Sequence, residues 1–194
     1  MLWLALVLFL ALVIAILRGG RLTNLGDIEL RSWWLLILGF VLQAATRFLP
    51  REVWAETAGI LMVLGSFLIL LILVVLNRES PGMWLAGVGV LMNFTVISLN
   101  GGMPVLAEAA EVASGFTQSN PDIAGSFKHV VLGPTTILPA LGDLIPLRLA
   151  GQGQVISLGD VFLAVGLGRF LEHELRKPRR YFKKGASAEA GSAH

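Results

Sequence analysis

Long apolar runs with very few charges are the feature that most constrains this chain. Residues 2–17 contain no charged side chain, and in residues 53–76 Glu56 is the only one. A helix needs about 20 mostly apolar residues to cross the hydrocarbon core of a bilayer. Charged residues make up only 14% of the 194 residues and hydrophobic residues 55%, whereas soluble domains contain roughly 25% charged residues. The pattern predicts an integral membrane protein.

Five segments are predicted to cross the membrane as helices: 2–17, 32–49, 53–76, 82–99 and 157–171. The first four begin near a tryptophan, which is typical of aromatic anchors at the membrane interface. We therefore expect an all-α polytopic membrane protein, with residues 1–175 forming a single transmembrane domain. Residues 176–194 are predicted to be a basic, disordered cytoplasmic tail.

The longest connection, residues 100–156, follows the fourth predicted span. Within it, segment 104–114 is predicted to form a short helix, because Pro104 suits a first turn and the acidic and apolar residues fall on opposite sides. Segment 129–147 is apolar but contains three prolines, which disfavour a continuous helix. We expect this segment to be re-entrant or interfacial and packed against protein, where irregular backbone is tolerated.

Lysine and arginine residues set the expected orientation. With five spans and the N-terminus outside, the inner loops and the tail hold most of these residues, and Arg47, Arg51, Lys128 and Arg148 lie outside. The positive-inside rule favours this arrangement, with the C-terminus in the cytoplasm. A basic cluster beside a span is more typical of contact with anionic lipid than with nucleic acid. The expected partners are the lipid bilayer and a partner membrane protein, with no nucleic acid.

Two of the predicted spans each carry a face of small and polar residues. In the fourth span these residues are Gly82, Ala86, Gly89, Asn93 and Asn100; in the fifth they are Asp160, Ala164, Gly168 and Glu172. Small residues allow helices to approach closely, and asparagine can form hydrogen bonds across the contact. The two spans are predicted to pack through these faces, which would bring Asn100 and Asp160 to the same outer end.

Four polar residues, Asn100, His129, Asp143 and Asp160, are the candidates for a ligand-binding or docking site. We expect them to gather near the outer face and to receive a lipid-like small molecule or a partner protein. Each also has a structural interpretation: packing for Asn100, an interfacial hydrogen bond for His129, and helix capping for the aspartates, since Ser157 to Asp160 matches a capping box.

Two further functions stay open. A membrane-embedded enzyme would use Asp143, Asp160 and His129 as an acid–base group. A small transporter is the other alternative, although an odd number of spans without an inverted repeat is not typical of one. No residue is assigned as catalytic, and no cofactor follows from the sequence. The chain has no cysteine, which excludes thiolate ligands, and no metal site is expected.

Four motifs follow one another in the second half of the chain: Asn100-Gly-Gly-Met-Pro-Val105, Lys128-His129, Leu141-Gly-Asp-Leu-Ile-Pro146 and Ser157-Leu-Gly-Asp160. Together they resemble a family of small bacterial polytopic membrane proteins of unknown function with NGGxPV, LGDxIP and SLGD motifs. The resemblance covers the chain up to about Leu175. It implies location in a bacterial plasma membrane and a cluster of motifs at the outer face, and it implies no particular activity.

Overall fold

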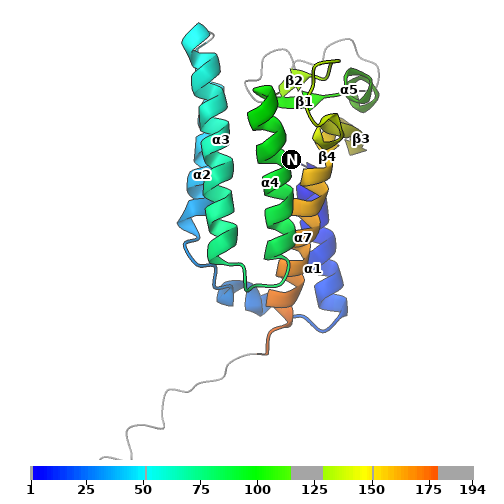
Figure 1. Cartoon of the computed structure of the whole chain (residues 1–194). Helices are drawn as coiled ribbons and strands as arrows, with labels where there is room; N and C mark the ends of the chain where they lie inside the picture. The colour runs from blue at the N-terminus through cyan, green and yellow to red at the C-terminus, as the bar shows by residue number, and fades with distance from the viewer. Residues whose placement is uncertain (1, 51, 115–128, 150, 179–194) are drawn as a thin grey trace, which may run out of the picture.

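The computed structural model describes residues 2–50, 52–114, 129–149 and 151–178 as a helical bundle with a small cap at one end (Figure 1). The long helices are α1 (Leu2–Leu17), α2 (Trp34–Ala45), α3 (Val53–Leu76), α4 (Met83–Asn100) and α7 (Leu158–Arg176). Two short 3-10 helices, η1 (Leu22–Asp27) and η2 (Thr46–Phe48), follow α1 and α2.

The bundle has two parts that meet at α4. Helix α7 packs against both α4 and α1, while α2 and α3 form a hairpin that packs on α4 through α3 (Figure 1). Helices α3 and α4 run in opposite directions and are joined by a short turn, residues 77–82. We call the end of the bundle at this turn the turn end, and the opposite end the cap end.

The cap is a four-stranded mixed sheet with one short helix and one 3-10 helix. Its strands are β1 (Met103–Val105), β2 (His129–Val131), β3 (Asp143–Leu149) and β4 (Gln152–Ser157), and its helices are α5 (Ala107–Ser114) and η3 (Pro139–Leu141). The order is β2-β1-β3-β4, with β1 parallel to both neighbours and β3 antiparallel to β4. Strand β4 leads directly into α7, which attaches the cap to the bundle.

The sheet overturns the all-α prediction and the re-entrant or interfacial interpretation of segment 129–147. This segment forms β2, η3 and most of β3 instead of a single apolar unit. Its prolines are compatible with this structure: Pro139 begins η3, and Pro146 is exposed on β3 opposite Val155. The short helix predicted from residue 104 is present but begins at Ala107, because Pro104 belongs to β1.

The predicted number of spans is also wrong. Among the described residues, two helical segments, Trp54–Leu76 and Met83–Asn100, are long and apolar enough to cross a membrane. Helices α1 and α2 are shorter, with 16 and 12 residues. Helix α7 has 19 residues but carries several charges in its second half. The fold is therefore mixed, with two candidate spans in place of five.

The helix ends agree with the local sequence. Helix α4 stops where Gly101 adopts a left-handed conformation with φ of 68°, as the Asn-Gly-Gly sequence predicts. Helix α7 begins at a capping box formed by Ser157 and Asp160, which confirms that prediction. The helix continues to Arg176, and residues 179–194 of the predicted tail lie outside the described residues.

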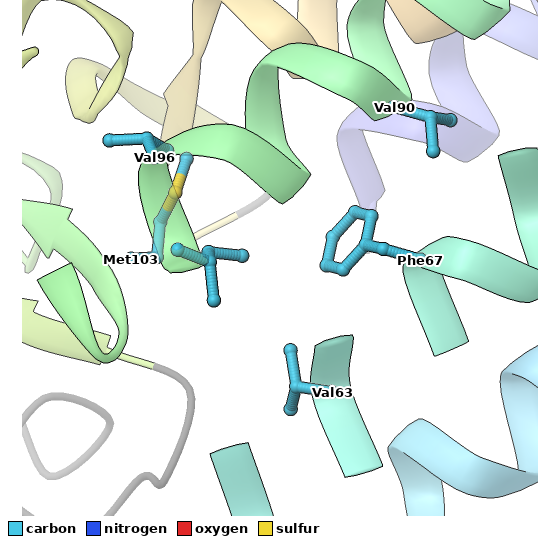
Figure 2. Close-up of a cluster of buried hydrophobic side chains, with 6 residues drawn as sticks. Val63, Phe67, Val90, Val96 and Met103 are labelled. Atoms are coloured by element: carbon cyan, nitrogen blue, oxygen red, sulfur yellow. The ribbon is translucent and has the colours of Figure 1, made fainter. Parts of the chain in front are cut away.

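A buried apolar cluster joins α3, α4 and the first strand of the cap. Figure 2 shows Val63 and Phe67 of α3 on one side, and Val90, Val96 and Met103 on the other. Ile97 of α4 is buried in the same cluster. Each fully buried aliphatic or aromatic side chain of this kind contributes about 1.5–3 kcal/mol relative to its exposed state. This cluster fixes the position of α4, and hence of the cap, relative to α3.

Candidate functional site

Helices α4 and α7 approach so closely that glycines are required on both. A Cβ at Gly89 would lie 2.3 Å from the carbonyl oxygen of Gly159, and a Cβ at Gly166 would lie 2.3 Å from the backbone nitrogen of Ala86. The predicted packing of these two segments is therefore confirmed, as is the small face of α4. The predicted face of α7 is only partly right, because Gly168 lies against Ala11 of α1.

A polar cluster lies at the cap end of this contact and consists of Asn93 and Ser157, which are buried, and Asp160, which is half-buried. We call it the buried polar cluster. Asn93 Nδ2 donates to Asp160 Oδ1 at 2.8 Å, and Ser157 Oγ donates to Asn93 Oδ1 at 2.9 Å. The backbone nitrogen of Ser157 donates to Asp160 Oδ2 at 3.3 Å, and the Asp160 nitrogen donates to Ser157 Oγ at 3.0 Å. Both carboxylate oxygens of Asp160 therefore accept hydrogen bonds that hold α7, β4 and α4 together.

His129 and Asp143 lie side by side in the cap. His129 Nε2 is 3.8 Å from Asp143 Oδ2, and the aspartate side chain is 8% exposed. Strand β1 lies between β2 and β3, with His129 opposite Met103 and Asp143 opposite Val105, so the contact spans β1. On the other side, Asp143 pairs with Ser157 in the β3–β4 ladder. This register connects the His129–Asp143 pair to the buried polar cluster through the backbone.

Asn100 has a different role in the structure. Its Nδ2 donates to the carbonyl oxygens of Val96 at 2.8 Å and Ile137 at 2.9 Å, and its Oδ1 accepts from the backbone nitrogen of Ile137 at 2.8 Å. The side chain thus binds both backbone groups of Ile137 and holds the segment before η3 against the end of α4. Leu138, the next residue, has a positive φ of 55°.

The four candidate residues thus lie in three different arrangements. His129 and Asp143 are in contact, Asp160 belongs to the buried polar cluster, and Asn100 binds the backbone of Ile137. Their gathering around a single centre stays a prediction. Asn93 and Ser157 were not among the candidates, although an asparagine in the middle of an apolar helix is itself a signal of an interhelical hydrogen bond.

The described part of the chain contains no cluster of metal-binding side chains. No group of three or more histidine, aspartate or glutamate side chains there could hold a metal ion. Asp160 accepts structural hydrogen bonds through both carboxylate oxygens, and His129 and Asp143 do not belong to a group of three such side chains among the described residues.

An apolar groove lies on the side of the bundle where α4 and α7 meet near the turn end. Its volume is about 400 Å³, and its lining residues are Gly82, Trp84, Leu85, Val88, Val165 and Arg169. Trp84 is 69% exposed, and the Arg169 side chain is 66% exposed. Arg169 is the only charged lining residue, and its Nη1 lies 3.7 Å from Glu172 Oε2. We call this hollow the α4–α7 groove.

These features define a helical protein in which a small mixed sheet is fixed onto the ends of two closely packed helices. The chain belongs to the family described as "Family of unknown function (DUF5317)", whose model matches residues 27–171. It is 31% identical over 175 residues to an uncharacterised protein of Thermotoga maritima, strain MSB8, and this match covers 89% of the chain and 90% of that protein. No solved structure matches the chain. Membership in a family of unknown function is confirmed, whereas its membrane character and the three motifs stay predictions.

Proposed function

We propose that this protein is an integral protein of a bacterial plasma membrane that binds a phospholipid in the α4–α7 groove. In this proposal the hairpin of α3 and α4 crosses the membrane, the cap lies outside, and residues 77–82 face the cytoplasm. The observation that carries the lipid assignment is the composition of the groove, an apolar wall with one exposed arginine and one exposed tryptophan at its rim.

The surface of α3 and α4 supports the membrane assignment. Helix α3 has 24 residues, and at 1.5 Å per residue it is about 36 Å long, enough to cross a hydrocarbon core of about 30 Å. Only 33% of its apolar window and 44% of that of α4 are buried inside the protein. Large apolar side chains such as Leu61, Ile72 and Leu91 are more than half exposed. Contact with lipid chains favours such an apolar surface, whereas its exposure to water is unfavourable.

The distribution of basic residues supports the orientation. Those at the turn end are Arg18, Arg21, Arg31, Arg78, Arg169, Arg176 and Lys177. Among the described residues, Arg47, in η2 before the start of α3, and Arg148, in β3 of the cap, are the ones toward the other end. The positive-inside rule then favours a cytoplasmic turn end and an outer cap. Helix α1 begins toward the cap end (Figure 1), which agrees with an N-terminus outside.

The groove has the chemistry of a phospholipid site. Leu85, Val88 and Val165 form an apolar wall that an acyl chain can cover. The Arg169 guanidinium carries five donors in a fixed geometry that suits the phosphate of a headgroup. Trp84 lies at the start of α4, where an aromatic ring is favoured at the level of the headgroups. A free anion would gain nothing from the apolar wall, so the combination favours a lipid.

An acid–base enzyme is the second candidate, and the contact between His129 and Asp143 is the observation that favours it. A catalytic group that also includes Asp160 is less favoured, because both carboxylate oxygens of Asp160 accept structural hydrogen bonds. Asp160 would have to leave the buried polar cluster to take part in a reaction. The lipid proposal needs no such rearrangement.

Quenching of Trp84 fluorescence tests the lipid assignment. In a variant that keeps Trp84 as its only tryptophan, brominated acyl chains quench the fluorescence wherever they contact the ring. We expect brominated phosphatidylglycerol to quench more strongly than brominated phosphatidylcholine at the same bromine density, because Arg169 binds the anionic lipid preferentially. Arg169→Gln should remove this difference, and Arg148→Gln, in the cap, should keep it.

Equal quenching by the two lipids in the parent variant would overturn the proposal. A difference that persists in Arg169→Gln would also overturn it, because the preference would then come from another part of the protein. Circular dichroism and gel filtration of both arginine variants verify that each retains the fold.

A further inference from the structure

The feature that leads to a second site is an amide oxygen that is buried without a partner. Asn24, in η1 at the turn end, is 5% exposed. Its Nδ2 donates to the carbonyl oxygens of Leu175 at 3.0 Å and Lys177 at 2.8 Å. Its Oδ1 has no hydrogen-bond partner among the described residues. Leaving a buried acceptor without a donor is unfavourable, so such groups normally accept a hydrogen bond.

The orientation of this amide is fixed by its neighbours. If Nδ2 and Oδ1 were exchanged, the oxygen would face two carbonyl oxygens, and both hydrogen bonds of the amide would be lost. Asn24 Oδ1 therefore stays an acceptor, and it needs a donor from outside the described residues.

Asn24 lines a hollow of about 240 Å³ between the end of α1, η1 and the end of α7. We call it the turn-end pocket. A water molecule occupies about 30 Å³ of liquid, so the pocket has room for a ligand much larger than one water. Three basic residues line it: Arg21, Arg176 and Lys177. The pocket that Asn24 lines is therefore rich in basic side chains.

The charges at the pocket are not all neutralised by the protein. Arg176 Nη1 lies 3.4 Å from Glu172 Oε1, and Lys177 Nζ lies 2.5 Å from Glu174 Oε1. Within the described part of the chain, no ion pair includes Arg21. Its backbone nitrogen donates to the Leu175 carbonyl oxygen at 2.9 Å, which fixes it at the edge of the pocket. Arg21 is thus a cation available to an anionic ligand.

The pocket needs a ligand that is an anion and also carries a neutral hydrogen-bond donor. An ammonium group could donate to Asn24 Oδ1, but Arg21, Arg176 and Lys177 would repel it. A phosphate monoester without a hydroxyl group has a second pKa of about 6, so above that pH it would bind the arginines but has no hydrogen to donate to the amide oxygen. A phosphate ester with a hydroxyl group satisfies both requirements.

We propose that the turn-end pocket binds a hydroxyl-bearing phosphate ester, with the phosphate on Arg21 and Arg176 and the hydroxyl group donating to Asn24 Oδ1. Glycerol phosphate has this chemistry. It can come from the headgroup of phosphatidylglycerol or from a soluble glycerol phosphate. The pocket is separate from the α4–α7 groove, so this inference does not depend on the function proposed above.

Titration of the full chain in a neutral detergent tests the inference. The probes are glycerol phosphate, ethyl phosphate, which lacks the hydroxyl group, and short-chain phosphatidylglycerol, each followed by calorimetry. We expect glycerol phosphate or phosphatidylglycerol to bind, and ethyl phosphate to bind about tenfold more weakly than glycerol phosphate, because it leaves Asn24 Oδ1 unmet. Binding of both hydroxyl-bearing probes identifies the shared group. Binding of phosphatidylglycerol alone identifies the lipid as the source when Arg21→Gln weakens it and Arg169→Gln, in the α4–α7 groove, does not. In that second case dioctanoyl phosphatidylethanol, which lacks the hydroxyl groups, replaces ethyl phosphate in the comparison.

Two exposed arginines provide the matched variants. Arg21→Gln should weaken binding by about tenfold or more, since it removes a charge-assisted contact with the phosphate. Arg78→Gln, at the same end of the bundle but outside the pocket, should change affinity less than about twofold. Circular dichroism verifies that both variants fold. Changing the ligand instead of Asn24 avoids the loss of its two structural hydrogen bonds.

Three results would overturn the proposal. In the first, neither glycerol phosphate nor phosphatidylglycerol binds at millimolar concentration. In the second, Arg21→Gln binds as tightly as the parent. In the third, the probes with and without the hydroxyl group bind equally well, which refutes the assignment of Asn24 Oδ1 as the acceptor.

Discussion

The close contact between α4 and α7 makes a quantitative prediction for Gly166→Ala. The added Cβ would lie 2.3 Å from the Ala86 nitrogen, 2.7 Å from the Gly82 oxygen and 2.8 Å from the Ala86 Cα. All three are backbone atoms, so no side-chain rotation relieves the contact. Since carbon atoms normally pack at about 3.5–4.0 Å, the helices must separate by about 1 Å. Overpacking of this kind costs about 1–3 kcal/mol.

Gly168→Ala is the matched control, because it adds the same methyl group on the same helix. Its Cβ would meet the Ala11 Cβ at 3.3 Å and the Val7 Cγ1 at 4.0 Å, which are side-chain atoms of α1. Both variants gain the higher helix propensity of alanine, about 0.8–1.0 kcal/mol in water. The difference between them therefore isolates the α4–α7 contact.

Thermal unfolding in detergent, followed by tryptophan fluorescence, measures the difference. A chain of this size shifts its midpoint by about 2–4 °C per kcal/mol, so Gly166→Ala should unfold several degrees below Gly168→Ala. If Gly166→Ala unfolds at the same temperature as the control or above it, the close approach of the two helices is refuted.

Three further predictions concern the polar contacts. Asn93→Ala removes the bonds to Ser157 and Asp160, and it should lower the free energy of unfolding by about 1–3 kcal/mol in the same assay; an unchanged midpoint would contradict the buried polar cluster. Asn100→Ala should strongly accelerate hydrogen exchange of the Ile137 backbone amide, because it removes the one acceptor described for that N–H group. Unchanged exchange would contradict the role of Asn100 in holding this segment. The hydrogen bond from Arg18 lowers the pKa of Glu172 below its usual 4.5. The ionised Glu172 therefore stabilises the fold above pH 4.5, and this stabilisation is lost as the pH falls through the lowered pKa. Arg18→Gln should reduce this loss of stability in acid, and a pH profile of stability identical to that of the parent would refute the role of Arg18.

Local features of the fold could be predicted from the sequence. The capping box at Ser157 and Asp160 and the end of α4 at Gly101 each depend on a few adjacent residues, and both are present. The contact between α4 and α7 could be predicted because small residues recur at helical spacing. The predicted contact face of α7 is only partly correct, because α7 packs against α1 as well as α4. Its small residues are therefore divided between two neighbouring helices.

The sheet could not be predicted in this way, because β1 pairs with β2 and β3 only through long-range contacts, while the local β3–β4 hairpin lacks a clear alternating pattern in its sequence. Strands β1 and β2 have only three residues each, too few for a periodic pattern, and β2 pairs with a segment 26 residues earlier, as in Met103 with His129. Strand β3 does alternate between less and more exposed residues, but its apolar composition conceals this pattern. The role of Asn24 could not be predicted, since a single asparagine in a short segment such as η1 is explained only by its hydrogen bonds to the end of α7.

The central claim is that the α3–α4 hairpin crosses a membrane, with the cap and the turn on opposite sides. Cysteine labelling tests it directly, because the chain contains no cysteine. Thr135→Cys in the cap and Glu79→Cys in the turn are both exposed positions. With a membrane-impermeant thiol reagent, we expect intact cells to be labelled at position 135 and not at 79, and permeabilised cells to be labelled at both. Labelling of intact cells at 79 without 135, or equally at both, would contradict the account.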